Sequence, residues 1–209
     1  LINKIKKSKT VASVVEEYEK PVLGRLKKNF AESGIDYESS HITILAFKRE
    51  RRLEVYAKNK KSEDWKKFKT YEFTGFSGKI GPKLKEGDRQ IPEGVYKVES
   101  LNPNSSYHLS LRVNYPNDFD KKKGELDERK KLGGDIMIHG RAVTIGCIPI
   151  GYENIEELFV LAAKSYKAGI PVVIAPTDFR NMTNAPTFAE IDWEEELYSK
   201  IRVELQKFQ

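Results

Sequence analysis

Residues 135 to 150, Asp-Ile-Met-Ile-His-Gly-Arg-Ala-Val-Thr-Ile-Gly-Cys-Ile-Pro-Ile, contain the only cysteine of the chain, Cys147, and one of its three histidines, His139. Glycine follows the histidine and precedes the cysteine. The apolar run from 136 to 138 predicts a short buried strand that delivers His139 to a loop. The stretch therefore carries an imidazole and a thiol close together in sequence, beside a predicted sheet.

These two side chains suit acyl transfer by a cysteine nucleophile. A thiol is nucleophilic only as the thiolate, and a free thiol is mostly protonated at neutral pH. An imidazole within hydrogen-bond reach can accept the proton. The glycine at position 146 leaves backbone N–H groups free to face a developing oxyanion. Because a free cysteine is more often a small buried apolar side chain, the two residues alone leave a structural role for Cys147 open.

Composition bounds the class of protein. The 209 residues suffice for one domain with a sizeable core and flanking helices. They are 39% hydrophobic and 33% charged, and no run of about 18 apolar residues predicts a membrane span. The first residues lack the pattern of a secretory signal. Because the sequence begins at leucine and not at methionine, this does not indicate the cytoplasm.

Charge and ligand patterns exclude several functions. The net charge of +6 comes from lysines spread along the chain without a nucleic-acid-binding motif, so we expect a solubilising surface and no nucleic-acid partner. One cysteine cannot form an internal disulfide. Three scattered histidines and one cysteine give no metal-ligand spacing. No phosphate-cradling glycine loop is present, so no cofactor is expected.

Apolar periodicity predicts a helix near each end of the chain. Residues 10 to 33 repeat apolar side chains at spacings of three and four. Pro21 is expected to divide this stretch into two pieces, and Gly34 to end it. A closing helix is expected to begin at Asp192, with Glu195 as its capping-box partner. We expect the first stripe to face the core, although it could instead bind a partner.

Strands and one further helix are expected between these helices. Asn154 is expected to cap a helix that runs to about Ala168. The long polar stretch from 114 to 134 is expected to be a loop, which is often functional at such a length. Alternating or apolar β-branched residues predict strands at 41–47, 53–57, 65–73, 95–101, 107–113 and 170–175.

Several motifs resemble one known family. His139-Gly140 followed by Thr144-Ile145-Gly146-Cys147 resembles the His-Gly and Ser/Thr-x-Gly-Cys signature of the L,D-transpeptidase (YkuD-like) catalytic domain, with the short spacing of its YafK-like branch. Further segments similar to that branch are Gly81-Pro82-Lys83, Glu86 to Gln90, Pro92 to Tyr96, and Asn114 to Asn117 with Asp120. The chain departs from most members at Ile148-Pro149, where they carry a polar or basic residue soon after the cysteine.

The resemblance implies a fold. That fold is α+β, a YkuD-like mixed β-sandwich with peripheral helices, with the cysteine on a loop beside the sheet and both terminal helices packed on it. Three parts are expected: an N-terminal helical segment (1–39), an L,D-transpeptidase-like catalytic domain (40–180) and a C-terminal helical extension (181–209).

The resemblance also implies a reaction, cysteine-dependent acyl transfer on peptidoglycan stem peptides. Cys147 would attack a carbonyl next to a diamino-acid residue and form a thioacyl intermediate, while His139 accepts and returns the proton. Backbone N–H groups at Gly146 and Cys147 would stabilise the oxyanion. The carbonyl of Thr144 is the candidate that orients the imidazole.

Two residues are candidates for substrate binding, and the resemblance implies the partners. Arg141 is a candidate for pairing with a substrate carboxylate, and Tyr115 for lining the substrate groove. The expected partners are peptidoglycan stem peptides, with a wall-linked lipoprotein as an open addition, in the periplasm or cell envelope. Crosslinking, hydrolysis and amidase activity stay open. The alternative from another class is a non-catalytic peptidoglycan-binding module with a degenerate site, which Ile148-Pro149 favours.

Overall fold

The computed structural model describes residues 8–181 and 184–208. Within these residues, eight strands form one mixed sheet in the order β3-β2-β1-β8-β4-β5-β6-β7. The pairs β1–β8 and β6–β7 are parallel, and the others are antiparallel. The strands are β1 (Ser40–Phe47), β2 (Arg52–Asn59), β3 (Lys66–Glu72), β4 (Gly94–Asn102), β5 (Ser110–Val113), β6 (Met137–His139), β7 (Ile148–Pro149) and β8 (Pro171–Ala175), and the helices are α1 (Val11–Ser33), α2 (Asp118–Leu126), α3 (Tyr152–Ser165) and α4 (Glu194–Leu205).

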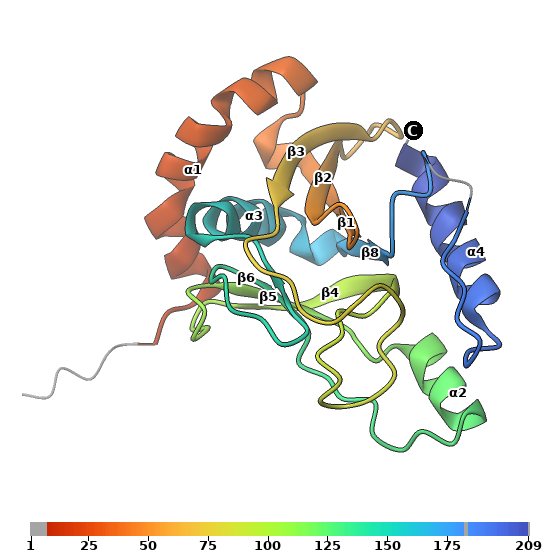
Figure 1. Ribbon diagram of the computed structural model, residues 1–209. Helices are drawn as coiled ribbons and strands as arrows, with labels where there is room; N and C mark the ends of the chain where they lie inside the picture. Colours follow the sequence, from red (N-terminus) through yellow and green to blue (C-terminus); the bar gives the residue numbers. More distant parts are fainter. Residues whose placement is uncertain (1–7, 182–183, 209) are drawn as a thin grey trace, which may run out of the picture.

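Helix α3 lies between the two halves of this sheet (Figure 1). It contacts β1 in one half and β4, β5 and β6 in the other. Its buried side chains form much of the main core and include Ile155, Leu158, Phe159, Val160 and Leu161. Each fully buried large apolar side chain contributes roughly 1.5–3 kcal/mol to stability. The predicted α+β class with a mixed sheet and peripheral helices is confirmed, and the two layers belong to one continuous sheet.

Helix α1 is continuous, so the predicted break at Pro21 is wrong. An interior proline costs about 3 kcal/mol because it removes a hydrogen bond and crowds the preceding turn. The burial of Val14, Val22 and Leu26, on both sides of the proline, offsets that cost. Gly34 ends the helix at a φ of 67°, as predicted. The helix packs against α3 and β3, which confirms that its apolar stripe faces the core.

Helix α2 lies inside the stretch that was expected to be a loop, so that prediction is wrong in part. A reciprocal capping box starts the helix: the Asn117 side chain accepts from the Asp120 N–H, and the Asp120 carboxylate accepts from the Asn117 N–H, both at 3.0 Å. Apolar periodicity could not reveal this helix, because its buried residues are Lys123 and Gly124.

Two predicted helix starts are also wrong. Helix α3 begins at Tyr152, and the Asn154 side chain donates to the Ile150 carbonyl oxygen (2.7 Å) instead of capping the first turn. Helix α4 begins after Trp193, not at Asp192, and its first turn has no side-chain cap. Trp193, the residue before the helix, is buried, and its Nε1–H donates to the Asp127 carboxylate (2.9 Å).

The predicted strands are confirmed to within a few residues, with one substantive difference. Strand β5 begins at Ser110, although alternation predicted a start at residue 107. His108 has a φ of 80°, which lies in the left-handed region and is incompatible with a strand.

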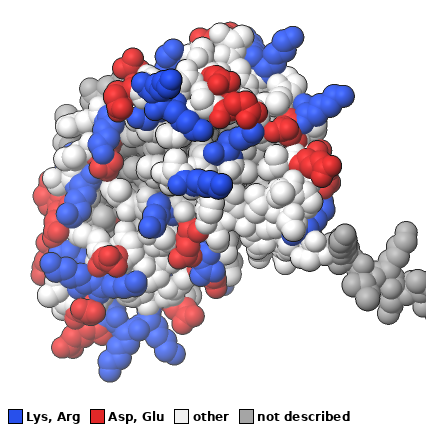
Figure 2. All heavy atoms as spheres, turned by 180° about the vertical axis from the view of Figure 1, so that it is seen from behind, with Lys and Arg blue, Asp and Glu red and all other residues white. Residues whose placement is uncertain are grey.

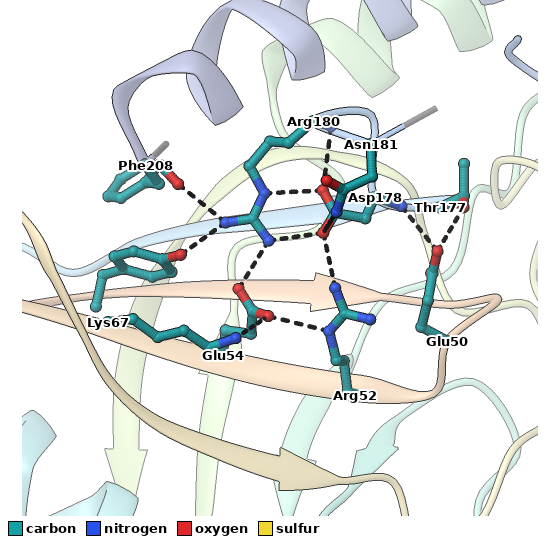
Figure 3. A network of polar contacts seen from close by, with 10 residues as sticks. Glu50, Arg52, Glu54, Lys67, Thr177, Asp178, Arg180, Asn181 and Phe208 are labelled. Carbon is teal, nitrogen blue, oxygen red and sulfur yellow. Dashed lines mark hydrogen bonds and ion pairs between the residues drawn. The ribbon is translucent and has the colours of Figure 1, made fainter. Parts of the chain in front are cut away.

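A polar network joins β2 to the segment that follows β8 (Figure 3). The Arg180 guanidinium donates to Asp178 (2.8 and 2.7 Å), to Glu54 (2.8 Å) and to the carbonyl oxygen of Phe208 (3.0 Å). Arg52 donates to the same two carboxylates, at 3.0 Å from Glu54 and 2.7 Å from Asp178. The network therefore ties the sheet to both the 176–181 segment and the C-terminal residues.

The surface carries both signs of charge. On the face seen in Figure 2, lysines and arginines lie among aspartates and glutamates and form no continuous patch of one sign. Among the residues that the structure describes, no helix combines the length and apolar character needed to cross a membrane.

Candidate active site

The pairing of β6 with β7 brings His139 and Cys147 to one edge of the sheet. Ile138 is paired with Ile148 in parallel register. Cys147 immediately precedes β7 and so lies beside Met137, two positions before His139 along β6. No hydrogen bond joins the imidazole to the thiol in the described part of the chain; Sγ contacts the carbonyl oxygen of residue 135 at 3.5 Å. The register therefore places the two residues on the paired segments, two positions apart.

The imidazole of His139 is buried and held by packing. The residue is 1% exposed, and its ring centroid lies 4.6 Å from that of Tyr107. Burial lowers the pKa of His139 to about 4, so the ring is neutral at pH 7. Its Nδ1 has no hydrogen-bond partner among the residues that the structure describes. The Thr144 carbonyl, which was expected to orient the ring, therefore does not bond to Nδ1, and the aromatic contact takes that place.

Thr144 instead organises the turn that carries Cys147. Its Oγ1 accepts from the Gly146 N–H (3.2 Å) and from the Cys147 N–H (2.9 Å), and it donates to the Cys147 carbonyl oxygen (2.8 Å). The two amides expected to face an oxyanion are thus bonded to this hydroxyl. Gly146 has a φ of 132°, and a Cβ there would lie 3.0 Å from the Gln90 carbonyl oxygen, so the turn packs tightly against residue 90.

Replacing Thr144 by valine is expected to lower the free energy of unfolding by about 1–3 kcal/mol, because two backbone N–H groups lose their acceptor. Thr144→Ser keeps the hydroxyl and is the matched control. Urea denaturation of both variants measures the difference. Equal stability of the valine and serine variants would show that the hydroxyl does not hold the turn.

The thiol of Cys147 is half-buried and protonated at neutral pH. Burial raises its pKa above the ordinary value of 9.0, while a hydrogen bond from the Met137 backbone and the charge of nearby Lys83 act in the opposite direction. Because burial lowers the pKa of the His139 ring to about 4 and raises that of the thiol, moving a proton from the thiol to the imidazole is uphill in this state. Both groups are therefore neutral, and the structure does not hold a thiolate–imidazolium pair.

The rate of Cys147 alkylation by iodoacetamide is expected to rise steadily with pH up to and beyond 9, because only the thiolate reacts. No plateau should appear between pH 5 and 8. Intact-mass spectrometry of the singly alkylated protein measures the rate at each pH. A rate that is already high and constant near pH 6 would instead reveal a preformed ion pair.

Cys147 lines a pocket of 440 Å³. The pocket is bounded on one side by the turn that carries the cysteine and on the other by the 83–89 segment; its lining residues are Lys83, Glu86, Gly87, Arg89, Gly133, Gly134, Asp135, Ile136, Ile145, Gly146 and Cys147. The thiol therefore faces a space large enough for part of a peptide.

Neither of the two predicted substrate-binding residues lines this pocket. Arg141 is exposed and lines a separate pocket of 580 Å³ beside His108. Tyr115 is 4% exposed, and its hydroxyl donates to the Leu132 carbonyl oxygen (3.0 Å), so it supports the loop from beneath. These two residues are not brought to the thiol.

Two cations that sequence analysis did not single out lie in the pocket instead. Lys83 and Arg89 both line it. The signal was present, because both belong to the 81–90 segment that resembles the YafK-like branch, but nothing in its composition assigned it to the cysteine. Within the described residues, no group of three or more histidine, cysteine, aspartate or glutamate side chains could hold a metal.

The fold and this site define the class of protein. Residues 41–174 match the model of the YkuD family, described as the L,D-transpeptidase catalytic domain, and the chain belongs to that family. The predicted family is thus confirmed.

Individual relatives agree. The chain is 34% identical over 136 residues to YafK of Escherichia coli strain K12, whose name places it provisionally among the L,D-transpeptidases. That match covers 64% of this chain and 52% of YafK, so the chain spans about half the length of the curated relatives it matches. The helical cell shape determining protein Pgp2 of Campylobacter jejuni has a similar fold, with a TM-score of 0.53 at 20% identity over 87% of this chain and 77% of that one. A mutant of Pgp2 gives a TM-score of 0.52 at 25% identity over 68% and 49%.

Proposed function

We propose that this chain catalyses cysteine-dependent acyl transfer on peptidoglycan stem peptides, in the periplasm or cell envelope. The observation that carries the proposal is that Cys147, in a chain of the L,D-transpeptidase family, lines an open pocket at the edge of the sheet. His139, with its buried neutral imidazole, lies on the neighbouring strand, two positions after Met137, the residue beside Cys147.

The first step of the proposed reaction forms a thioester. The sulfur of Cys147 attacks a carbonyl next to a diamino-acid residue and forms a thioester, and His139 accepts the thiol proton and passes a proton to the leaving amine. Because proton transfer alone is strongly uphill, it is expected to occur together with attack on the carbonyl. The N–H groups of Gly146 and Cys147 are the proposed oxyanion donors. They donate to the Thr144 hydroxyl in this structure, so those two bonds would break when the N–H groups donate to the oxyanion.

The fate of the thioester decides the outcome. Attack by an amine of a second stem peptide makes a crosslink, and attack by an amine of a wall-linked lipoprotein anchors that protein. Attack by water gives hydrolysis of a diaminopimelate-linked bond, as in a carboxypeptidase or amidase. Incubation of the purified protein with muropeptides, followed by mass spectrometry, separates these products. Absence of cleavage, exchange and crosslinking would contradict the proposal.

A second candidate function is a peptidoglycan-binding module without turnover. The raised pKa of the thiol and the unpartnered Nδ1 of His139 favour it, since neither group is activated in this structure. Such a module would bind muropeptides and leave their masses unchanged. The same incubation, with binding measured by calorimetry, distinguishes it from the enzyme.

A further inference from the structure

Two side chains of opposite charge in the Cys147 pocket have no partner within residues 8–181 and 184–208. Arg89 and Glu86 both line the pocket and are both exposed. In the described part of the chain, neither side chain takes part in a hydrogen bond or ion pair, and they do not pair with each other. The pocket therefore presents one free guanidinium and one free carboxylate.

The other charged residues of the pocket are already neutralised. Lys83 Nζ contacts Asp88 at 2.6 Å, and its side chain is 5% exposed. Asp135 pairs with Arg112 at 2.6 Å. A charged ligand in this pocket would therefore meet Arg89 and Glu86 as the available counter-charges.

Arg89 is fixed next to the turn that carries the thiol. Its φ of 57° lies in the left-handed region, which is costly for a residue with a side chain. A Cβ on Gly146 would lie 3.8 Å from the Arg89 carbonyl carbon, so the backbones of the two segments are in contact. The backbone of the arginine is thus anchored close to the turn that carries Cys147, although no described residue bonds to its side chain.

We propose that this pocket binds the zwitterionic end of a diamino acid, with its α-carboxylate on Arg89 and its α-ammonium on Glu86. A guanidinium matches the planar geometry of a carboxylate, and a carboxylate accepts from an ammonium. The inference rests on the proposed function and deepens it. A diaminopimelate residue that is attacked at one centre keeps a free α-amino-acid group at its other centre, and the pocket beside the sulfur has one counter-charge for each.

The test uses a chemical pair that differs by one group, a stem tetrapeptide with diaminopimelate and the same peptide with lysine, which lacks only the side-chain carboxylate. Binding is measured by calorimetry in a Cys147→Ala background, so that no turnover intervenes. The Cys147→Ala protein, the parent of the variants below, is expected to bind the diaminopimelate peptide with an affinity about tenfold to a hundredfold higher than the lysine peptide. This is the range of a charged hydrogen bond. Arg89→Asn should abolish the preference, and asparagine tolerates left-handed backbone.

Matched variants complete the design. Arg141→Gln removes an exposed arginine from the other pocket and should retain the full preference. Glu86→Gln should abolish the preference for a free over an acetylated side-chain amine. An unchanged melting temperature confirms that each variant is folded.

The outcomes separate this inference from the proposed function. If Arg89→Asn keeps the parent's preference, the assignment of the carboxylate to Arg89 is overturned. If the wild type processes both peptides equally well, the function stands and the zwitterion site fails. If the parent binds neither peptide and the wild type changes neither mass, both are overturned.

Discussion

Cys147→Ala is expected to lower the turnover of muropeptides by at least about 10⁴-fold, because loss of a covalent nucleophile removes the whole thioester route. The residual rate then comes only from binding and orientation of the substrate. Intact-mass spectrometry is expected to detect a thioacyl adduct on the wild type and none on the variant. No other cysteine can take over, since the chain has only one.

The same substitution is expected to leave the fold intact. Cys147 is half-buried, and the contact of its sulfur with the carbonyl oxygen of residue 135, at 3.5 Å, is weak. The change in the free energy of unfolding should therefore stay near 1 kcal/mol. Circular dichroism and thermal denaturation check this. A variant that is inactive because it is unfolded would favour a purely structural role for the cysteine, and a folded variant with wild-type turnover would remove the sulfur from the mechanism.

The sheet was accessible to sequence analysis because its signal is local. Strands such as β1 and β8 are runs of apolar and β-branched residues, and they are confirmed close to their predicted bounds. His139 and Cys147, which are close in sequence, also lie at adjacent strands in the structure, because a single loop joins the parallel strands β6 and β7.

The errors share a physical origin in contacts between distant segments. Pro21 does not break α1, because packing on α3 outweighs the local penalty of proline. Helix α2 escapes detection because a polar capping box, and not an apolar stripe, defines it.

The substrate side of the site was predicted least well. Arg141 is close to His139 in sequence but lines a different pocket, whereas Arg89 is far away in sequence and lines the pocket of Cys147. Only the packing of residues 89 and 90 against Gly146 brings that arginine to the thiol. Spacing along the chain carries no information about such a contact.

Arg180→Met is expected to lower the free energy of unfolding by about 3–5 kcal/mol at pH 7, because it leaves two buried carboxylates without their main cation. The side chains of Asp178 and Glu54 are 3% and 1% exposed, and Arg180 binds both. Urea denaturation measures the loss. The matched control is Lys9→Met, which breaks the exposed pair with Glu17 and should cost less than about 1 kcal/mol.

The pH dependence of this loss provides a second readout. Burial raises the pKa values of Asp178 and Glu54, but the bonds to Arg180, together with the bond from Lys67 to Glu54, reverse that effect and hold both below their ordinary values of 3.8 and 4.5. A depressed pKa contributes stability that is present above the ordinary value and is lost as pH falls through the folded-state value. The gap in unfolding free energy between wild type and Arg180→Met should therefore be fully present at pH 7 and should shrink as the pH falls below about 4. If the gap is independent of pH, or if Lys9→Met costs as much, then packing of the long side chain and not its charge stabilises this end of the sheet.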